Sequence, residues 1–379
     1  MKLATFVRRA GVWDRPLDPT LDDPATLVLV FAHSGLLDEQ DPLSDLTETF
    51  PRSVMLGCST AGEVLDNTID DGTVTVAVAR FEHTRITKAV AHLPEAAGSF
   101  MAGESLARQL DAPDLRAVFV LSTGLGVNGS ELVRGVNSRL GPDVIVTGGL
   151  AGDGSRFART WVLGWSGPGR GLATAVGLYG DRIQVGHGSK GGWDIFGPER
   201  KVTRSEGNIL YELDGKPALE LYKRYLGDLA AGLPATGLRF PLALRETPES
   251  DKQLVRTILA VDESDQSMTF AGDIPQGWMA QLMRADFDRL ITGAEDAARM
   301  AWPVQDGSVG DVLAIAISCV GRRMVLGEAA EEEVEATLEM LPEGTRQVGF
   351  YSYGELSPYA SGACDLHNQT MTLTTVQET

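Results

Sequence analysis

Short runs of apolar and β-branched residues alternate along this chain with amphipathic segments, and this pattern is typical of a mixed α/β protein. The run 26–35, TLVLVFAHSG, predicts a buried strand, and the segment 41–50 predicts a helix whose apolar residues share one face. The run 52–57, RSVMLG, predicts a second strand that ends in a glycine-rich turn. The first repeating unit is therefore strand, helix, strand and turn.

The same order of segments recurs twice more. In the second copy, a strand at 116–124 is followed by a helix at 130–141, with Ser130 as its expected cap, and by a strand and turn at 143–154. The third copy comprises a strand at 311–323, a helix bearing Val334, Leu338 and Leu341, and a strand and corner at 346–356. The repetition indicates internal duplication.

Between the second and third copies the pattern changes. The segments 181–197 and 200–215 alternate like antiparallel strands, and 216–227 predicts a helix closed by a glycine. We expect an α/β fold of two related mixed α/β halves, with a ligand cleft between them. The expected division is an N-terminal extension at 1–24, a first domain at 25–215 and a second at 216–379.

Charge and composition exclude several classes of partner. The chain has 379 residues and a formal net charge of −19 without a basic patch, so nucleic acid and anionic membrane surfaces are not expected to bind it. The first residues lack the apolar core of a signal peptide and the longest apolar runs have strand length, which predicts a cytoplasmic protein without membrane insertion. Three scattered cysteines predict neither a zinc site nor a disulfide framework.

The three repeating units end in similar acidic corners. They read AGE at 61–63, AGD at 151–153 and YGE at 353–355. In open α/β sheets ligands collect at the carboxyl ends of strands, and a glycine there allows a turn that aims the next side chain outward. Each corner therefore presents a carboxylate that can receive an ammonium group or a hydroxyl.

A pair of arginines follows another strand end, in SCVGRR at 318–323. Neighbouring residues of an extended chain point in opposite directions, so at most one of Arg322 and Arg323 is expected to face inward. An inward Arg322 could grip a carboxylate while Glu63 and Glu355 receive a cation, which together suit a zwitterion such as an amino acid. Alternatively, the arginine pairs with one of those glutamates and closes the sheet ends.

Other motifs are weak. Two stretches match the dinucleotide-binding pattern GxGxxG. GHGSKG at 186–191 lies between β segments and not before a helix. GLGVNG at 124–129 opens a helix and has Asp153 further along, but a tight turn is favoured there over a dinucleotide site. GCSTAG at 57–62 has the wrong spacing for a hydrolase nucleophile, and no catalytic cluster or metal-ligand spacing is visible. His187 and His367 are the two histidines whose surroundings could leave a ring nitrogen open to a ligand, although a structural role suits both.

Taken in order, the motifs resemble the FIST family of bacterial sensory proteins, with a FIST N-terminal domain followed by a FIST C-terminal domain. The likeness covers about residues 25–375 and rests on FAHSG, GCSTAGEV, STGLGVNG, GGLAGDG, LDGKPALELYKRYLG, FPLAL, SCVGRR, GFYSYGELSP and HNQTMTL. The resemblance implies a signal-input protein that senses a small ligand. Many members carry a fused output domain, whereas this chain ends with TLTTVQET, so we expect a stand-alone sensor. Its output partner would be a histidine kinase, a cyclic-dinucleotide enzyme or a chemotaxis protein.

The corners and the matched motifs supply the candidate ligand-binding residues. These are Thr60, Gly62, Glu63, Ser122, Asn128, Gly152, Asp153, Arg322, Tyr353, Gly354, Glu355, His367 and Asn368.

Two alternatives to an amino-acid sensor stay open. Some FIST proteins are haem-binding nitric oxide sensors, so the resemblance allows a haem sensor that regulates a histidine kinase, with His187 or His367 as the iron ligand. The second alternative is an enzyme that uses Glu63 and Glu355 as a general acid and base, which requires the two carboxyl groups to lie roughly 5–9 Å apart.

Overall fold

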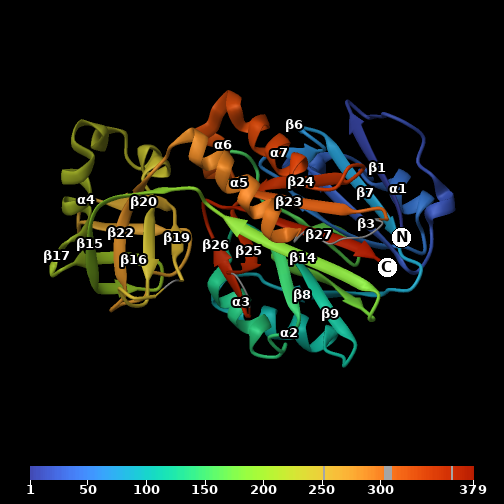
Figure 1. Cartoon of the computed structure of the whole chain (residues 1–379), viewed down its shortest axis with the longest axis horizontal. Helices are drawn as coiled ribbons and strands as arrows, with labels where there is room; N and C mark the ends of the chain where they lie inside the picture. The colour runs from blue at the N-terminus through green and yellow to red at the C-terminus, as the bar shows by residue number, and fades with distance from the viewer. Residues whose placement is uncertain (251, 303–309, 360–361) are drawn as a thin grey trace.

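The computed structural model describes residues 1–250, 252–302, 310–359 and 362–379. It has a mixed α/β fold, and four sheets carry the strands of these described residues. Figure 1 shows a large α/β body and, at one end, a smaller domain built mainly of strands. The two chain ends lie close together at the far side of the body.

The three repeating units predicted from the sequence are present. Each has two parallel strands joined through a helix, and an antiparallel strand beside the first of them. Unit 1 consists of β3 (Thr26–Ala32), α1 (Ser44–Thr49), β4 (Val54–Ser59) and β7 (Val74–Arg80). Unit 2 consists of β9 (Leu115–Ser122), α3 (Gly129–Asn137), β10 (Ile145–Leu150) and β13 (Leu172–Tyr179). Unit 3 consists of β23 (Leu313–Cys319), α6 (Val320–Leu326), α7 (Ala330–Glu339), β24 (Arg346–Ser352) and β27 (Met371–Glu378).

The strand that follows each corner leaves its own sheet and joins the next unit. Strand β5 (Glu63–Leu65), after the corner of unit 1, pairs with β24 of unit 3. Strand β25 (Gly354–Pro358), after the corner of unit 3, pairs with β10 of unit 2. Strand β11 (Val162–Gly164), beyond the corner of unit 2, pairs with β4 of unit 1. The exchange therefore runs in a closed cycle through all three units.

Further strands complete the three sheets of the body. The sheet of unit 1 adds β12 (Gly167–Gly169), β1 (Lys2–Arg9) and β2 (Val12–Trp13). The sheet of unit 2 adds β26 (Cys364–His367) and β8 (Arg85–His92). The sheet of unit 3 adds β14 (Ile183–Lys190) and β6 (Thr68–Asp70). Residues 2–9 thus extend the sheet of unit 1, although they precede the first domain expected from the sequence.

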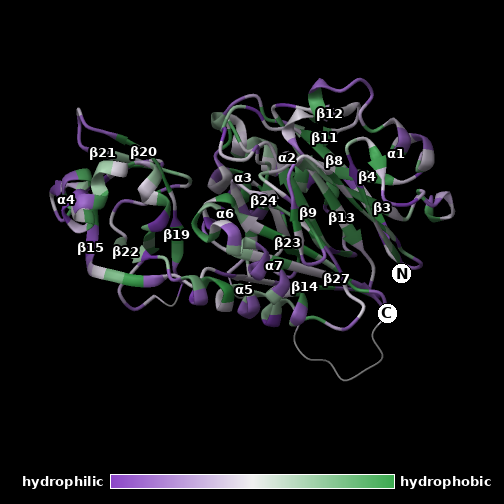
Figure 2. Ribbon diagram, turned by 90° about the horizontal axis from the view of Figure 1, so that it is seen from above, coloured by the Kyte–Doolittle hydropathy of each residue, from purple (hydrophilic) through white to green (hydrophobic). Residues whose placement is uncertain are grey.

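The core lies between the sheets and the helices that cover them. All seven residues of β3 and all seven of β23 are buried, as expected for strands with both faces covered. Helices α2 (Ser99–Leu110) and α3 pack together beside unit 2, and α5 (Phe287–Ala301) packs on β14. In Figure 2 the central strands are largely green, whereas α5 alternates between green and purple, as an amphipathic surface helix does.

The smaller domain, which we call the β domain, is inserted between β14 and α5. Its eight-stranded sheet comprises β15 (Asp194–Glu206), β16 (Ile209–Leu213), β17 (Lys216–Pro217), β18 (Leu242–Arg245), β19 (Leu254–Arg256), β20 (Ile258–Asp262), β21 (Ser267–Phe270) and β22 (Met279–Arg284), with α4 (Ala218–Leu226) beside it. It has a separate apolar core that includes Val202, Leu219 and Phe270. The boundary expected near 215 falls inside this sheet.

Two local expectations were wrong. Helix α3 begins after Asn128, whose Oδ1 accepts the backbone N–H of Glu131 at 3.1 Å, so Asn128 and not Ser130 is the cap. Residues 320–326 form the helix α6 instead of continuing the strand, so Arg322 and Arg323 lie on a helix and not on extended chain. None of the helices in the described part of the chain is long and apolar enough to cross a membrane.

Candidate functional site

The three acidic corners meet where the units exchange strands. The backbone N–H of Ala61 donates to the carbonyl of Tyr351 at 2.8 Å, which joins the first corner to the third. The N–H of Tyr353 donates to Leu150 at 3.1 Å, and the N–H of Gly152 donates to Ser59 at 2.9 Å. Each corner is thus fixed by backbone hydrogen bonds to its neighbour.

Glu63 and Glu355 occupy matching hydrogen-bond networks. Glu63 accepts from the hydroxyl of Thr60, three residues before it, and from the N–H and hydroxyl of Thr73 at 2.9 and 3.0 Å. Glu355 accepts from the hydroxyl of Ser352 at 2.6 Å and from the N–H and hydroxyl of Thr370 at 3.2 and 2.9 Å. The two threonines directly precede β7 and β27. Each glutamate therefore ties its corner to the start of the antiparallel strand of its own unit.

Burial changes the acidity of both glutamates. It raises the pKa of Glu63 to about 7 and the pKa of Glu355 to about 8, although their hydrogen bonds oppose the shift. The carboxyl group of Glu355 is completely buried, whereas that of Glu63 lies at the edge of a cavity. Both groups change protonation near neutral pH.

Asp153, at the corner of unit 2, organises a loop. It accepts the backbone N–H groups of Ala158 and Arg159, both at 2.9 Å, and the hydroxyl of Tyr353. Although burial opposes the change, these hydrogen bonds lower the pKa of Asp153. Tyr353 also donates to the carbonyl of Gly154 at 2.9 Å, and its ring stacks on Phe157 with centroids 4.5 Å apart. The loop 154–159 is thus fastened at both ends.

A cavity of about 750 Å³ opens at the carboxyl ends of β3 and β4, which we call the strand-end cavity. Unit 1 supplies most of its wall, the loop 154–159 supplies a second side, and α6 supplies a third. The lining residues are His33, Ser34, Gly35, Thr60, Ala61, Gly62, Glu63, Asp71, Gly72, Gly154, Ser155, Arg156, Arg159, Val320, Arg323 and Met324. Residues from both ends of the sequence therefore meet around one space.

Three arginines converge on the strand-end cavity. Arg323 pairs with Asp71 through two hydrogen bonds of 2.7 and 2.8 Å, and also donates to the carbonyl of Ala61 at 2.6 Å. Arg159 pairs with Asp38. Arg156 is exposed, donates to the hydroxyl of Ser34 at 3.1 Å, and has no ion pair among the described residues. Its guanidinium group is therefore available to an anion.

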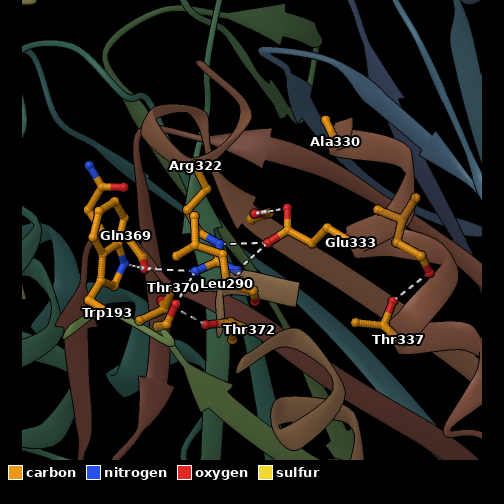
Figure 3. A network of polar contacts seen from close by, with 12 residues as sticks. Trp193, Leu290, Arg322, Ala330, Glu333, Thr337, Gln369, Thr370 and Thr372 are labelled. Atoms are coloured by element: carbon orange, nitrogen blue, oxygen red, sulfur yellow. Dashed lines mark hydrogen bonds and ion pairs between the residues drawn. The ribbon is translucent and has the colours of Figure 1, made fainter. Parts of the chain in front are cut away.

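Arg322 is fully buried and does not line the cavity, and Figure 3 shows its polar contacts. Its Nε donates to Glu333 at 2.6 Å, and the two side chains form an ion pair with no exposed surface. Its Nη1 donates to the carbonyl of Gly191, and its Nη2 donates to that of Leu290 at 2.9 Å. Gly191 lies just before β15 and Leu290 lies in the first turns of α5. Arg322 therefore holds both chain segments that connect the body to the β domain.

Glu333 is held by further polar groups. The hydroxyls of Ser318 and Tyr351 each donate to its Oε2 at 3.0 Å. The Nη1 of Arg322 also reaches the carbonyl of Gln369 at 3.3 Å, and this carbonyl accepts the indole N–H of Trp193 at 2.7 Å. The network shown in Figure 3 is therefore nearly complete in hydrogen bonds, and none of its labelled residues lines the strand-end cavity.

Models of known protein families match most of this chain. The FIST N domain matches residues 26–216, and the FIST C domain matches residues 218–358. The chain belongs to the FIST family. FIST domains are associated with small-ligand sensing in signal transduction, so the family favours binding over catalysis. Comparison with curated proteins finds no match.

The candidate residues of this FIST protein fall into separate groups. Thr60, Gly62 and Glu63 line the strand-end cavity. Gly152, Asp153 and Tyr353 lie behind it, where they hold the corner and the loop that carries Arg156.

The other candidates are absent from the cavity lining. Gly354 and Glu355 lie on β25, His367 ends β26 and Asn368 follows it, and all four residues are buried. Neither amide atom of Asn368 has a hydrogen-bond partner among the described residues, and the same holds for the hydroxyl of Ser122. Asn128 contacts the β domain, because its Nδ2 donates to Asp273 at 3.0 Å. Glu63 and Glu355 therefore do not flank a common substrate in this cavity.

The two candidate haem ligands are poorly placed for iron. His367 is 4% exposed, and its Nε2 lies 2.9 Å from the carbonyl oxygen of Ser357. His187 lies within β14, where its Nδ1 is buried without a partner among the described residues. Neither lines the strand-end cavity. The surroundings of both residues do not fit a haem group.

Sequence reasoning missed most of the charged lining. Arg156 and Arg159 follow the AGD corner directly, and their spacing within a loop after a strand end was a usable signal. Of the two adjacent arginines, only Arg322 was a candidate ligand-binding residue, and Arg323 was not. Asp71 precedes the glycine of a turn, and nothing local marks it as the partner of an arginine far along the chain.

Gly62→Ala is expected to disturb the cavity more than Gly72→Ala. Both glycines line it and have positive φ, +134° and +81°, so alanine strains the backbone at either position by roughly 1–3 kcal/mol. Only at Gly62 would the new Cβ collide with another group, since it would lie 2.4 Å from Nη1 of Arg323, whereas nothing lies within 4 Å at Gly72. Thermal unfolding should show a larger decrease in the unfolding temperature for Gly62→Ala than for Gly72→Ala. Equal losses would mean that Arg323 moves aside freely.

Proposed function

We propose that this FIST protein is a sensory module that binds a small carboxylate-bearing ligand, such as an amino acid, in the strand-end cavity. The observation that carries the proposal is the guanidinium of Arg156, which has no ion pair among the described residues and lines the same cavity as Arg159 and Arg323. Arginine forms bidentate hydrogen bonds with carboxylates, and a cavity of this size is typical of small-molecule sites.

The charges around the cavity favour an anionic group on the ligand. Asp71 and Asp38 already neutralise Arg323 and Arg159, and burial lowers the pKa of His33, which keeps it neutral near pH 7. Among the lining residues, Arg156 then carries the remaining positive charge; Glu63 offsets it when ionised, and the carboxylate of Asp153 behind the cavity offsets it in part.

Glu63 can bind the ammonium group of a zwitterion. Its Oε2 accepts two hydrogen bonds, whereas its Oε1 accepts one, from Thr60, and so retains capacity for a further donor. An ammonium group beside it would favour the ionised form and lower its pKa. A zwitterion would therefore satisfy Arg156 and Glu63 together.

Helix α6 offers a route from the ligand to the rest of the protein. Arg323 reaches the cavity, and the adjacent Arg322 holds both connections to the β domain. A ligand that draws Arg323 away from Asp71 would shift α6, and with it the clamp on those connections. The β domain would then change its position and present the signal to a separate output partner, a histidine kinase, a cyclic-dinucleotide enzyme or a chemotaxis protein.

Thermal unfolding in the presence of single compounds tests the proposal. The probes are the common L-amino acids, succinate, acetate and inorganic phosphate, added one at a time. A ligand at a hundred times its dissociation constant should add about 2.7 kcal/mol of stability. We expect at least one carboxylate-bearing compound to raise the unfolding temperature, and Arg156→Met to weaken its affinity by roughly tenfold or more, since a charge-assisted hydrogen bond is lost.

Arg116→Met is the matched control. Arg116 is exposed at the start of β9, outside the cavity lining, so its replacement should leave the response unchanged. No response to any probe, or a response that Arg156→Met preserves in full, would contradict the proposal.

A further inference from the structure

A second cavity, of about 300 Å³, lies beside α1 and the edge of the sheet of unit 1. Its wall is mainly apolar, with Leu43, Phe50, Met55, Leu163 and Pro168 among the lining residues. Trp165 also lines it, and this tryptophan is 70% exposed although it borders an apolar space. We call this space the Trp165 cavity. It shares no lining residue with the strand-end cavity.

One cation reaches into the Trp165 cavity. Lys88 extends from β8, and its Nζ donates to the carbonyl of Gly164 at 2.9 Å and lies 5.5 Å from the ring centroid of Trp165. Within the described residues it has no ion pair, and all other lining residues are uncharged. Burial lowers the pKa of Lys88 to about 8, as expected for an ammonium group whose charge lacks compensation.

We propose that the Trp165 cavity is a second ligand site, which takes a small organic anion with an apolar body. The carboxylate of such a ligand pairs with Lys88, and its body lies against Phe50, Met55 and the exposed face of Trp165. The positive charge of Lys88 and the apolar lining together favour an organic anion with an apolar body. A cation would be repelled by Lys88, a short polar anion would leave the apolar wall wet, and a neutral apolar molecule would leave the ammonium group unpaired.

The volume of the Trp165 cavity limits the size of the ligand. A volume of about 300 Å³ lies at the lower end of small-molecule sites, so a medium-length carboxylate fits this chemistry. Tryptophan offers a large flat surface with little conformational freedom to lose, which suits Trp165 to cover such a ligand.

Isothermal titration calorimetry with octanoate tests the inference. Octanol provides the same tail without charge, and acetate provides the charge without the tail. We expect octanoate to bind with one site per chain and at least about tenfold more tightly than either control compound. Lys88→Met should weaken octanoate binding by about tenfold or more and leave octanol binding unchanged, whereas Lys216→Met, at an exposed lysine of the β domain, should change neither.

Three results would overturn the inference: no saturable octanoate binding, equal affinity for octanoate and octanol, or unchanged octanoate binding in Lys88→Met. Should Lys88→Met fail to fold, Trp165→Ala at a largely exposed side chain provides the second variant, with the same loss expected. Arg156→Met should leave octanoate binding intact. If it abolishes that binding, octanoate occupies the strand-end cavity and the Trp165 cavity is not its site.

Discussion

Arg322→Met is expected to lower the free energy of unfolding by roughly 3–5 kcal/mol. The substitution leaves the carboxylate of Glu333 buried without its cation, and the carbonyls of Gly191 and Leu290 lose their donor. Guanidinium unfolding followed by circular dichroism and tryptophan fluorescence measures the change. Trp193 belongs to the network and is one of six tryptophans, so a fluorescence change that precedes the loss of circular dichroism and is absent from a Trp193→Phe background would report early loosening at the connection to the β domain.

Arg323→Met is the matched control, because it places the same substitution on the next residue of the same helix. Its partner Asp71 is 72% exposed, and a pair of this kind contributes at most about 1 kcal/mol. Arg323→Met should therefore nearly retain the stability of the native protein while it alters the strand-end cavity. The opposite pattern, a stable Arg322→Met protein that no longer responds to ligand, would show that Arg322 binds the ligand directly.

Glu355→Gln is expected to make stability less dependent on pH. Because burial raises the pKa of Glu355 to about 8 from an ordinary value of 4.5, the native protein has the full contribution of this group below about pH 4.5 and loses it progressively as the pH rises to about 8. Each pKa unit corresponds to about 1.4 kcal/mol, so the loss is on the order of 5 kcal/mol. Glutamine does not titrate, so the free energy of unfolding of the variant should rise relative to that of the native protein as the pH increases over this range.

Unfolding curves at intervals between pH 4 and pH 9 measure the effect, with Glu63→Gln in parallel. Glu63 has a pKa of about 7, so its variant should show the same sign and a smaller change that is complete at lower pH. Parallel curves for native and Glu355→Gln proteins would contradict the environment assigned to this carboxyl group. Because Glu355 is bound by Ser352 and Thr370, the variant is not expected to disrupt the ion pair between Arg322 and Glu333.

The repeating units were predictable because their signals are local. An uninterrupted apolar run such as 26–32, which has strand length and is rich in valine, favours a strand covered on both faces, and the helix that follows each such run returns the chain for a parallel partner. The exchange of β5, β25 and β11 was not predictable. Each has three to five residues, and its partner lies far away in the sequence, so pairing depends on tertiary contacts alone.

The candidate site shows the same division between local and distant information. The glycine and acid of each corner were visible, but the threonine partners of Glu63 and Glu355, Thr73 and Thr370, lie across a hairpin from them. For Arg322 and Arg323 the error was one of geometry. On a strand adjacent side chains point in opposite directions, whereas on α6 they diverge by about 100°, so one can reach Glu333 and the other the strand-end cavity.

The cyclic strand exchange also bears on how the chain can be divided. A cut between the segments that match the FIST N and FIST C domains would remove β24 from β5 and β25 from β10. Each fragment would then expose open sheet edges, and such edges pair readily with other chains. We therefore expect the two family segments to fold as a single unit and neither to fold when it is expressed without its counterpart.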